Sequence, residues 1–390
     1  MPKTFIPGDH KVTVPSFSAL SRPLSKIFRK MPALEAKGNR ALQMTFEDQL
    51  NALILFHLEE HESGRHLLQV LEQDYFALKE IAPEKGIQKS AFFEAINTRG
   101  LEQLQYVFNE LYLQASHLLP KGYDDLGDLV SIDGSLIDAT LSMYWADYRS
   151  KSNKAKAHVG FDLNRGIPRK IFLTDGKGAE RPYVSSILEP GQTGVMDRGY
   201  QSHKHFDALQ EEEKFFVCRI KESTRNTVIQ KNEIPDDGMI FYDAVCLLGT
   251  PGVNQTLKPV RVVGYRVGPK EYWLATNRHD LTAAQVAKIY RLRWNIEVFF
   301  GWWKKHLRVY HLIARSEYGL MVQLLAGLIT YLLLAIYCQE QYLEKVSIKR
   351  VRELRIKIRN ESKLLFGNMC SGSDHIGPGN LLPQQSHAIT

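Results

Sequence analysis

Residues 128–139 read DLVSIDGSLIDA, an apolar segment with an acid, Asp133, near its centre. Residues 156–164 (KAHVGFDLN) and 167–178 (IPRKIFLTDGKG) are two further short segments with many β-branched and aromatic residues. Segments of this kind, bounded by Gly, Asp and Asn, are typical of strands joined by turns. The sequence therefore predicts an antiparallel meander of three strands, with Asp133 on the first.

Alternating helix and strand patterns follow the meander. Residues 180–188 (ERPYVSSIL) and 202–213 (SHKHFDALQEEE) have helical patterns, whereas residues 193–200 (TGVMDRGY) and 214–221 (KFFVCRIK) resemble buried strands. Three strands followed by helix, strand, helix and strand indicate a mixed α/β domain.

Only strands are predicted between about residues 223 and 277. The β-rich segments TVIQKNEI, MIFYDAVCLL, PVRVVGYRVG and EYWLATN are separated there by Pro, Gly and Asp. We interpret this stretch as a β insertion within the α/β domain. A long helix is predicted after it, from Thr282, a suitable N-cap residue, to about Leu307.

The two ends of the chain have other patterns. Residues 45–119 repeat apolar residues at helical spacing, and residues 86–96 resemble the turn and second helix of a helix-turn-helix. The first forty residues are basic and weakly patterned. The predicted organisation is a helical DNA-binding domain at residues 1–120, the α/β domain at 121–345, a basic helix at 346–366 and a disordered tail at 367–390.

Composition narrows the class of protein. The 390 residues carry a formal net charge of +7, and 44% of them are hydrophobic. So apolar a chain can bury a sizeable core, which excludes a mostly disordered protein, and its basic balance favours a polyanionic partner. No secretory signal is visible, and Cys218, Cys246, Cys338 and Cys370 form no CxxC pair, so we expect reduced thiols in a cytoplasmic protein.

One segment is comparable to a membrane helix. Residues 320–338 (LMVQLLAGLITYLLLAIYC) are long and apolar enough to span a bilayer. Gln323 and Thr330 interrupt this run, and the rest of the chain has the pattern of a soluble protein. We expect a buried core helix and no membrane partner; a membrane anchor is the alternative.

Asp133 and Asp197 each follow apolar residues of a predicted buried strand. A carboxylate in such a position is costly unless it is paired or binds a metal ion. Each acid alone is also explained as a strand-end residue that makes a turn. Two such acids on separate strands of one α/β unit favour a shared site.

Glu297 is the only acid between residues 281 and 316, a stretch with seven Lys and Arg residues. It could be a simple ion-pair partner on a solvated face. A helix advances by about 100° per residue, however, which places Glu297 on one face with three other polar residues, beside an apolar stripe. The residues of this polar face are Tyr290, Arg293, Glu297 and Lys304.

These residue types suit phosphodiester cleavage. Two Mg²⁺ ions about 4 Å apart can activate a nucleophile and stabilise the leaving oxygen. Mg²⁺, or Mn²⁺ as a substitute, prefers oxygen ligands, so we predict that Asp133, Asp197 and Glu297 bind the metal ions. The predicted phosphate-binding residues are Tyr290, Arg293 and Lys304, of which Arg can bind bidentately.

Residues 290–304, YRLRWNIEVFFGWWK, resemble the signature Y-x2-R-x3-E-x6-K of the DDE transposases of the IS4 family of bacterial insertion sequences, and match it at every defined position. The first acid lies in D-G-S and the second in D-x-G-Y, as in that family. The resemblance covers roughly residues 125–345. It implies a ribonuclease-H-like core interrupted by a β insertion, with Asp133, Asp197 and Glu297 as the catalytic triad.

The same resemblance implies an activity and partners. A relative of this kind binds the terminal inverted repeats of its element, cleaves the DNA ends and joins the freed 3′-hydroxyls to target DNA, as a homodimer on double-stranded DNA in the bacterial cytoplasm, associated with the nucleoid. Relatives form a DNA hairpin and flip a base against a tryptophan of the β insertion. Trp273 is the candidate for that role, although a core aromatic on a strand is the simpler interpretation.

Two other functions are compatible with these residues. A ribonuclease-H-like nuclease would use the same triad to cut DNA without joining it, and a strand-transfer assay would separate the two. A domesticated DNA-binding protein would have lost catalysis, but the complete triad and signature helix argue against it.

Overall fold

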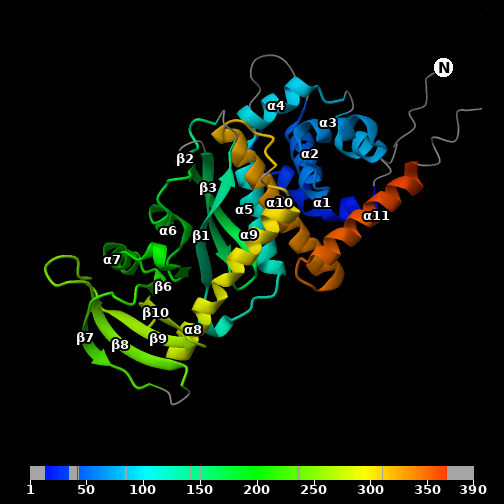
Figure 1. Ribbon diagram of the computed structural model, residues 1–390. Helices are drawn as coiled ribbons and strands as arrows, with labels where there is room; N and C mark the ends of the chain where they lie inside the picture. The colour runs from blue at the N-terminus through cyan, green and yellow to red at the C-terminus, as the bar shows by residue number, and fades with distance from the viewer. Residues whose placement is uncertain are drawn as a thin grey trace, which may run out of the picture.

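A computed structural model of the protein describes residues 14–34, 42, 44–83, 86–139, 143–149, 152–234, 238–309 and 311–366. Its centre is a ten-stranded sheet in the order β2-β3-β1-β5-β6-β10-β9-β8-β7, with β4 paired to β3 (Figure 1). The predicted disordered tail, residues 367–390, lies outside the described residues.

Five strands form the first part of the sheet. β3 is antiparallel to both β1 and β4, as the predicted meander requires, whereas β1, β5 and β6 are parallel neighbours. This mixed order confirms the expected α/β class with a ribonuclease-H-like core. The strands are β1 (Leu129–Asp138), β3 (Ser152–Asp162), β4 (Ile167–Asp175), β5 (Thr193–Met196) and β6 (Phe215–Ile220), and a short β2 (Asp147–Arg149), absent from the prediction, pairs with β3.

The β-rich stretch extends the same sheet. Its last strand is antiparallel to β6, and the preceding three strands continue outward from it. In Figure 1 they lie at the opposite end of the molecule from α2 (Phe46–Leu58) and α3 (Gly64–Gln73). These strands are β7 (Asn226–Lys231), β8 (Ile240–Leu248), β9 (Val260–Val267) and β10 (Lys270–Thr276).

Side chains alternate between the two faces of the sheet and enter two apolar cores. Val130, Ile132 and Met196 belong to the smaller core, which contains residues of α6 (Pro182–Ile187) and α7 (His203–Glu211). Leu129 and Val195 belong to the larger core, which also holds the remaining helices. Odd-numbered residues of β1 and β5 therefore face the larger core.

The N-terminal and C-terminal helices pack together in that larger core. The apolar run lies in α10, which contacts α1, α2, α4 and α5. Of the most apolar 18-residue stretch of this helix, 89% is buried. By length and composition α10 is the one helix of the described chain that could cross a membrane, but its apolar surface is covered by protein. The helices are α1 (Pro15–Phe28), α2 (Phe46–Leu58), α3 (Gly64–Gln73), α4 (Lys89–Thr98), α5 (Leu101–Leu118), α10 (Glu317–Tyr342) and α11 (Ile348–Phe366), with a π-helical turn at Ala77–Ile81.

The predicted long helix between the sheet and α10 is two helices. α8 (Ala283–Leu292) begins at Thr282, whose side chain forms a reciprocal capping box with Gln285. α9 (Trp294–His306) follows after a single residue, Arg293, where the hydrogen bonds shorten to the i−3 pattern. The prediction of one uninterrupted helix was therefore wrong, because the backbone tightens locally at Arg293 and separates α8 from α9.

Candidate active site

Asp133 and Asp197 occupy equivalent places on two adjacent parallel strands. The register of β1 and β5 pairs Leu129 with Thr193 and Ser131 with Val195. Continued by two residues, this register sets Asp133 beside Asp197, directly after the end of β5. Because neighbouring strands lie about 4.8 Å apart, both carboxyl groups start from adjacent points on the larger-core face of the sheet.

A tight turn fixes the carboxylate of Asp197. One oxygen accepts a hydrogen bond from the amide of Gly199 at 2.7 Å, which makes Asp197 the N-cap of a short 3₁₀ helix, Arg198–Tyr200. The ring of Tyr200 is buried beneath this turn, 1% exposed. Its pKa is raised, first by burial and then by the negative charges of Glu180, Asp133 and Asp197.

Arg293 connects Asp133 with Glu297. Its guanidinium lies 3.5 Å from a carboxylate oxygen of Asp133 and forms an ion pair with Glu297, one turn further along α9. Helix α9 packs on β1 from the larger-core side. The third predicted acid therefore faces the same side of the sheet as the two aspartates.

The environment of Asp133 makes it unusual among the acids of this chain. Burial raises its pKa to about 6, although the amide of Gly134 and the charge of Arg293 act in the opposite direction. The nearby charges of Asp197 and Glu180 raise it further. A carboxyl group in this position gains from any additional positive charge.

Glu180 is a further acid near Asp133 that the sequence did not reveal, and it lies on the opposite, smaller-core face of β1. It precedes α6 and forms an ion pair with Lys156 of β3 at 3.2 Å. A Cβ atom on Gly134 would lie 2.8 Å from a carboxylate oxygen of Glu180. A side chain at position 134 would therefore displace the carboxylate of Glu180.

Two residues of the signature helices are engaged with protein groups. Tyr290 is 7% exposed, with its ring beneath the guanidinium of Arg293 at 6.0 Å. Lys304 donates to the backbone carbonyl of Leu136 at 2.6 Å, and burial lowers its pKa. In this arrangement Tyr290 supports Arg293, and Lys304 holds α9 on β1; their contacts with phosphate remain predictions.

Two tryptophans near the site differ in exposure. Trp273 packs with Phe241 and Tyr242 against the smaller core, on the sheet face opposite the acids. Trp294, which directly follows Arg293, is 61% exposed. The proposed base contact of Trp273 stays a prediction, and the sequence did not single out Trp294, whose exposed ring directly follows Arg293.

The site has the donor chemistry of a divalent cation site. Within the described ranges, no group of three His, Cys, Asp or Glu side chains is arranged to hold a metal ion as it stands. The Arg293 guanidinium instead supplies positive charge to Asp133 and Glu297. All the acids concerned are oxygen donors, which fit Mg²⁺ or Mn²⁺ better than Zn²⁺.

A ribonuclease-H-like sheet with aspartates on two adjacent parallel strands, faced by a glutamate from a later helix, defines the DDE class of protein. Comparison with known sequences gives the family. A family model described as the transposase DDE domain matches residues 125–333, more than half of the chain, and the chain belongs to this family.

Three curated relatives are similar to the chain, and together they confirm the expected resemblance to insertion-sequence transposases, including the IS4 type. One is a putative transposase, y4zB, of Sinorhizobium fredii (strain NBRC 101917 / NGR234), 29% identical over 49% of this chain and 56% of its own. Another is a probable transposase for element IS5377 of Geobacillus stearothermophilus, 29% identical over 54% and 57%. The third is a putative transposase for element IS4SA of Synechocystis sp. (strain ATCC 27184 / PCC 6803 / Kazusa), 27% identical over 53% and 59%.

The aligned parts of these chains are limited in extent. The matches span 56%, 57% and 59% of the three relatives' own lengths. Among solved structures, a cryo-EM structure of the piggyBac transposase synaptic complex with hairpin DNA matches with a TM-score of 0.44 and 13% identity, over 95% of this chain and 84% of that one.

Proposed function

We propose that the protein is a transposase that binds the terminal inverted repeats of an insertion sequence, cleaves the DNA at its ends and transfers the freed strands to target DNA. The observation that carries this proposal is the common face of Asp133, Asp197 and Glu297, on adjacent strands and a facing helix. Membership of the transposase DDE domain family supports it.

In this proposal Asp133, Asp197 and Glu297 hold two Mg²⁺ ions, or Mn²⁺ in their place, and the ions supply charge stabilisation at the scissile phosphate and activation of the attacking oxygen. The raised pKa of Asp133 supports cation binding there. It indicates that the positive charge of Arg293 only partly offsets the cost of burying the carboxylate. Arg293 orients Asp133 and Glu297, and Tyr290 supports Arg293 from below.

The test is cleavage of a plasmid that carries both element ends, identified as inverted repeats in the DNA flanking the gene. We expect Asp133→Asn, Asp197→Asn and Glu297→Gln each to reduce cleavage in MgCl₂ at least roughly 100-fold, because ligand loss costs more than the loss of an outer-shell partner. DNA binding in EDTA stays close to that of the wild-type protein. Full cleavage by any one of these variants contradicts the assignment.

Strand transfer separates this proposal from the nuclease alternative. A transposase joins pre-cleaved ends with free 3′-hydroxyls to a second plasmid, whereas a nuclease releases ends without joining them. Because two ends must be brought together, we expect a homodimer on DNA, measurable by the mass of the complex with a single end.

A further inference from the structure

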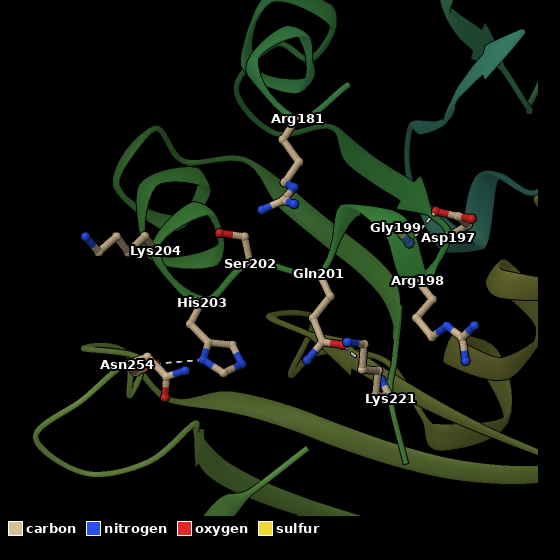
Figure 2. A pocket seen from close by; sticks show the side chains of 10 residues that line it. All are labelled: Arg181, Asp197, Arg198, Gly199, Gln201, Ser202, His203, Lys204, Lys221 and Asn254. Carbon is tan, nitrogen blue, oxygen red and sulfur yellow. Dashed lines mark hydrogen bonds between the residues drawn. The ribbon is translucent and has the colours of Figure 1, made fainter. Parts of the chain in front are cut away.

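A basic pocket of about 740 Å³ opens at Asp197, and neither Asp133 nor Glu297 lines it (Figure 2). Segments distant in the sequence form its walls: the start of α6, the turn from Asp197 into α7, the end of β6 and the loop at Asn254. Figure 2 shows Asp197 at one edge of the pocket, with Arg181 and Lys221 approaching from opposite sides. The pocket therefore continues directly from the candidate active site.

The pocket is strongly positive. Four of its lining side chains are basic and only one, Asp197, is acidic, whereas the whole chain has 50 basic and 43 acidic residues. Within the described part of the chain, none of these four basic side chains forms an ion pair, unlike the buried Arg261, which pairs with Asp243 at 2.6 Å. The four basic residues are Arg181, Arg198, Lys204 and Lys221.

Hydrogen bonds between the walls hold the pocket open. Gln201 accepts from the amide of Lys221 at 2.9 Å and donates to Thr224 at 3.0 Å. The ring of His203 contacts the carbonyl oxygen of Asn254 at 2.7 Å. The segments that carry Arg198, Lys204 and Lys221 are thus linked to one another, and Arg181 reaches the pocket from the start of α6.

The lining selects phosphate over a base. His203 is the one ring among the lining residues, and it is engaged with Asn254, so the pocket has no aromatic platform for stacking. Ser202 precedes α7 without capping its amides through its side chain. Uncapped amides at a helix start add further anion-binding capacity to the four basic side chains.

We infer that this pocket binds consecutive backbone phosphates of the DNA strand that continues from the scissile phosphate at Asp197. This inference rests on the proposed function, because it takes the acids to be the cleavage site. The pocket then fixes the direction in which the strand leaves that site, through contacts that carry no sequence information.

The test measures the salt dependence of DNA binding by Arg181→Gln/Lys221→Gln. The probe is a fluorescent duplex of about 30 base pairs with a single-stranded tail, titrated in EDTA between about 0.05 and 0.3 M NaCl. Loss of two phosphate contacts should lower the slope of log K against log[NaCl] by roughly 1.5 to 2, and affinity at about 0.1 M NaCl by roughly 10- to 100-fold. Thermal unfolding verifies that the variant is folded.

The matched control is Lys349→Gln/Arg352→Gln, which removes the same charge from α11, far from α7 in Figure 1. An unchanged slope in the pocket variant, or an equal loss in the control, overturns the inference. The triad variants report on the proposed function separately: if they lose cleavage while the pocket variant binds as the wild type, only the pocket assignment fails. If the triad variants cleave normally, the proposed function fails whatever the slopes show.

Discussion

Gly134 lies on β1 directly after Asp133, where the side chains of Glu180 and Lys156 leave little room for a side chain. A methyl group there would lie 2.8 Å from an oxygen of Glu180 and 3.2 Å from Cδ of Lys156. We expect Gly134→Ala to displace Glu180, break its ion pair with Lys156 and destabilise the protein by about 1 kcal/mol, as for loss of a partly exposed pair. Cleavage falls as well, because Asp133 precedes this residue. Urea unfolding and plasmid cleavage measure the two effects.

A double-mutant cycle isolates the cause. In a Glu180→Ala background the added methyl group meets no carboxylate, so Gly134→Ala should cost much less than in the wild-type protein. Equal costs in the two backgrounds would mean that the glycine is needed for the backbone of β1 and not for the approach of Glu180.

At this scale the sequence indicated three candidate acids, whose catalytic role stays a prediction, but not the residues around them. Asp133, Asp197 and Glu297 were recognisable because each is an acid in an apolar or basic setting. Glu180 was not, since nothing in its local sequence shows that the segment before α6 folds back over β1. The same holds for Lys304, whose bond to Leu136 depends on how α9 docks against the sheet.

At the scale of helices and strands, the buried hydrogen bonds of α10 can be tested with a single substitution. Gln323, fully buried on this helix, accepts from the amide of Ile313 at 2.9 Å and donates to the carbonyl of His311 at 2.9 Å. We expect Gln323→Leu to lower the free energy of unfolding by roughly 1 to 3 kcal/mol, because a buried amide loses its acceptor. Urea unfolding of the purified protein measures this change.

The membrane alternative makes the opposite prediction for the same substitution. In a bilayer, replacing Gln by Leu favours insertion, so the variant would be found more strongly in the membrane fraction and would be no less stable. Thr330→Val is a useful comparison, since its hydroxyl donates only within α10, to Ala326 at 2.8 Å. We expect a smaller effect there than at Gln323.

Elements defined by local pattern were predicted well, whereas their partners were not. β-Rich segments bounded by turn residues identified each strand from β3 to β10. The pairing of β10 with β6, however, joins residues that are 53 to 59 positions apart and leaves no local signal. Helix α1 was missed although Phe17, Leu20, Leu24 and Ile27 recur at helical spacing, because Pro23 and the surrounding bases mask the pattern. The face to which Trp273 points became evident only from that pairing.

The whole molecule depends on contacts between its two ends. Helix α2 from the N-terminal part packs against α10 from the C-terminal part, and both share the core that carries Glu297 on α9. The boundary predicted near residue 120 therefore remains a prediction, since the helices on either side of it are packed in one core. His57 lies in that core: its ring nitrogens contact the carbonyl oxygens of Leu307 at 2.5 Å and Gln323 at 3.2 Å.

Because His57 is fully buried in this core, the packing of the N-terminal helices against the C-terminal helices is sensitive to acid. Burial lowers the pKa of His57 from its ordinary value of 6.5 to about 4, against the raising effect of the two carbonyl groups. Neutral His57 therefore stabilises the folded state fully above pH 6.5. This stabilisation is lost as the pH falls toward about 4, because only the unfolded chain takes up a proton in that range.

The difference in unfolding free energy between the wild-type protein and His57→Gln should therefore decrease with acidification. At about 1.4 kcal/mol per pKa unit, the lowering from 6.5 to about 4 corresponds to a decrease of roughly 3 kcal/mol between pH 7 and pH 4. Urea unfolding across this pH range measures it, and His117→Asn, at an exposed position of α5, controls for removal of a histidine. A difference that stays constant with pH would show that His57 is not neutral in the folded core.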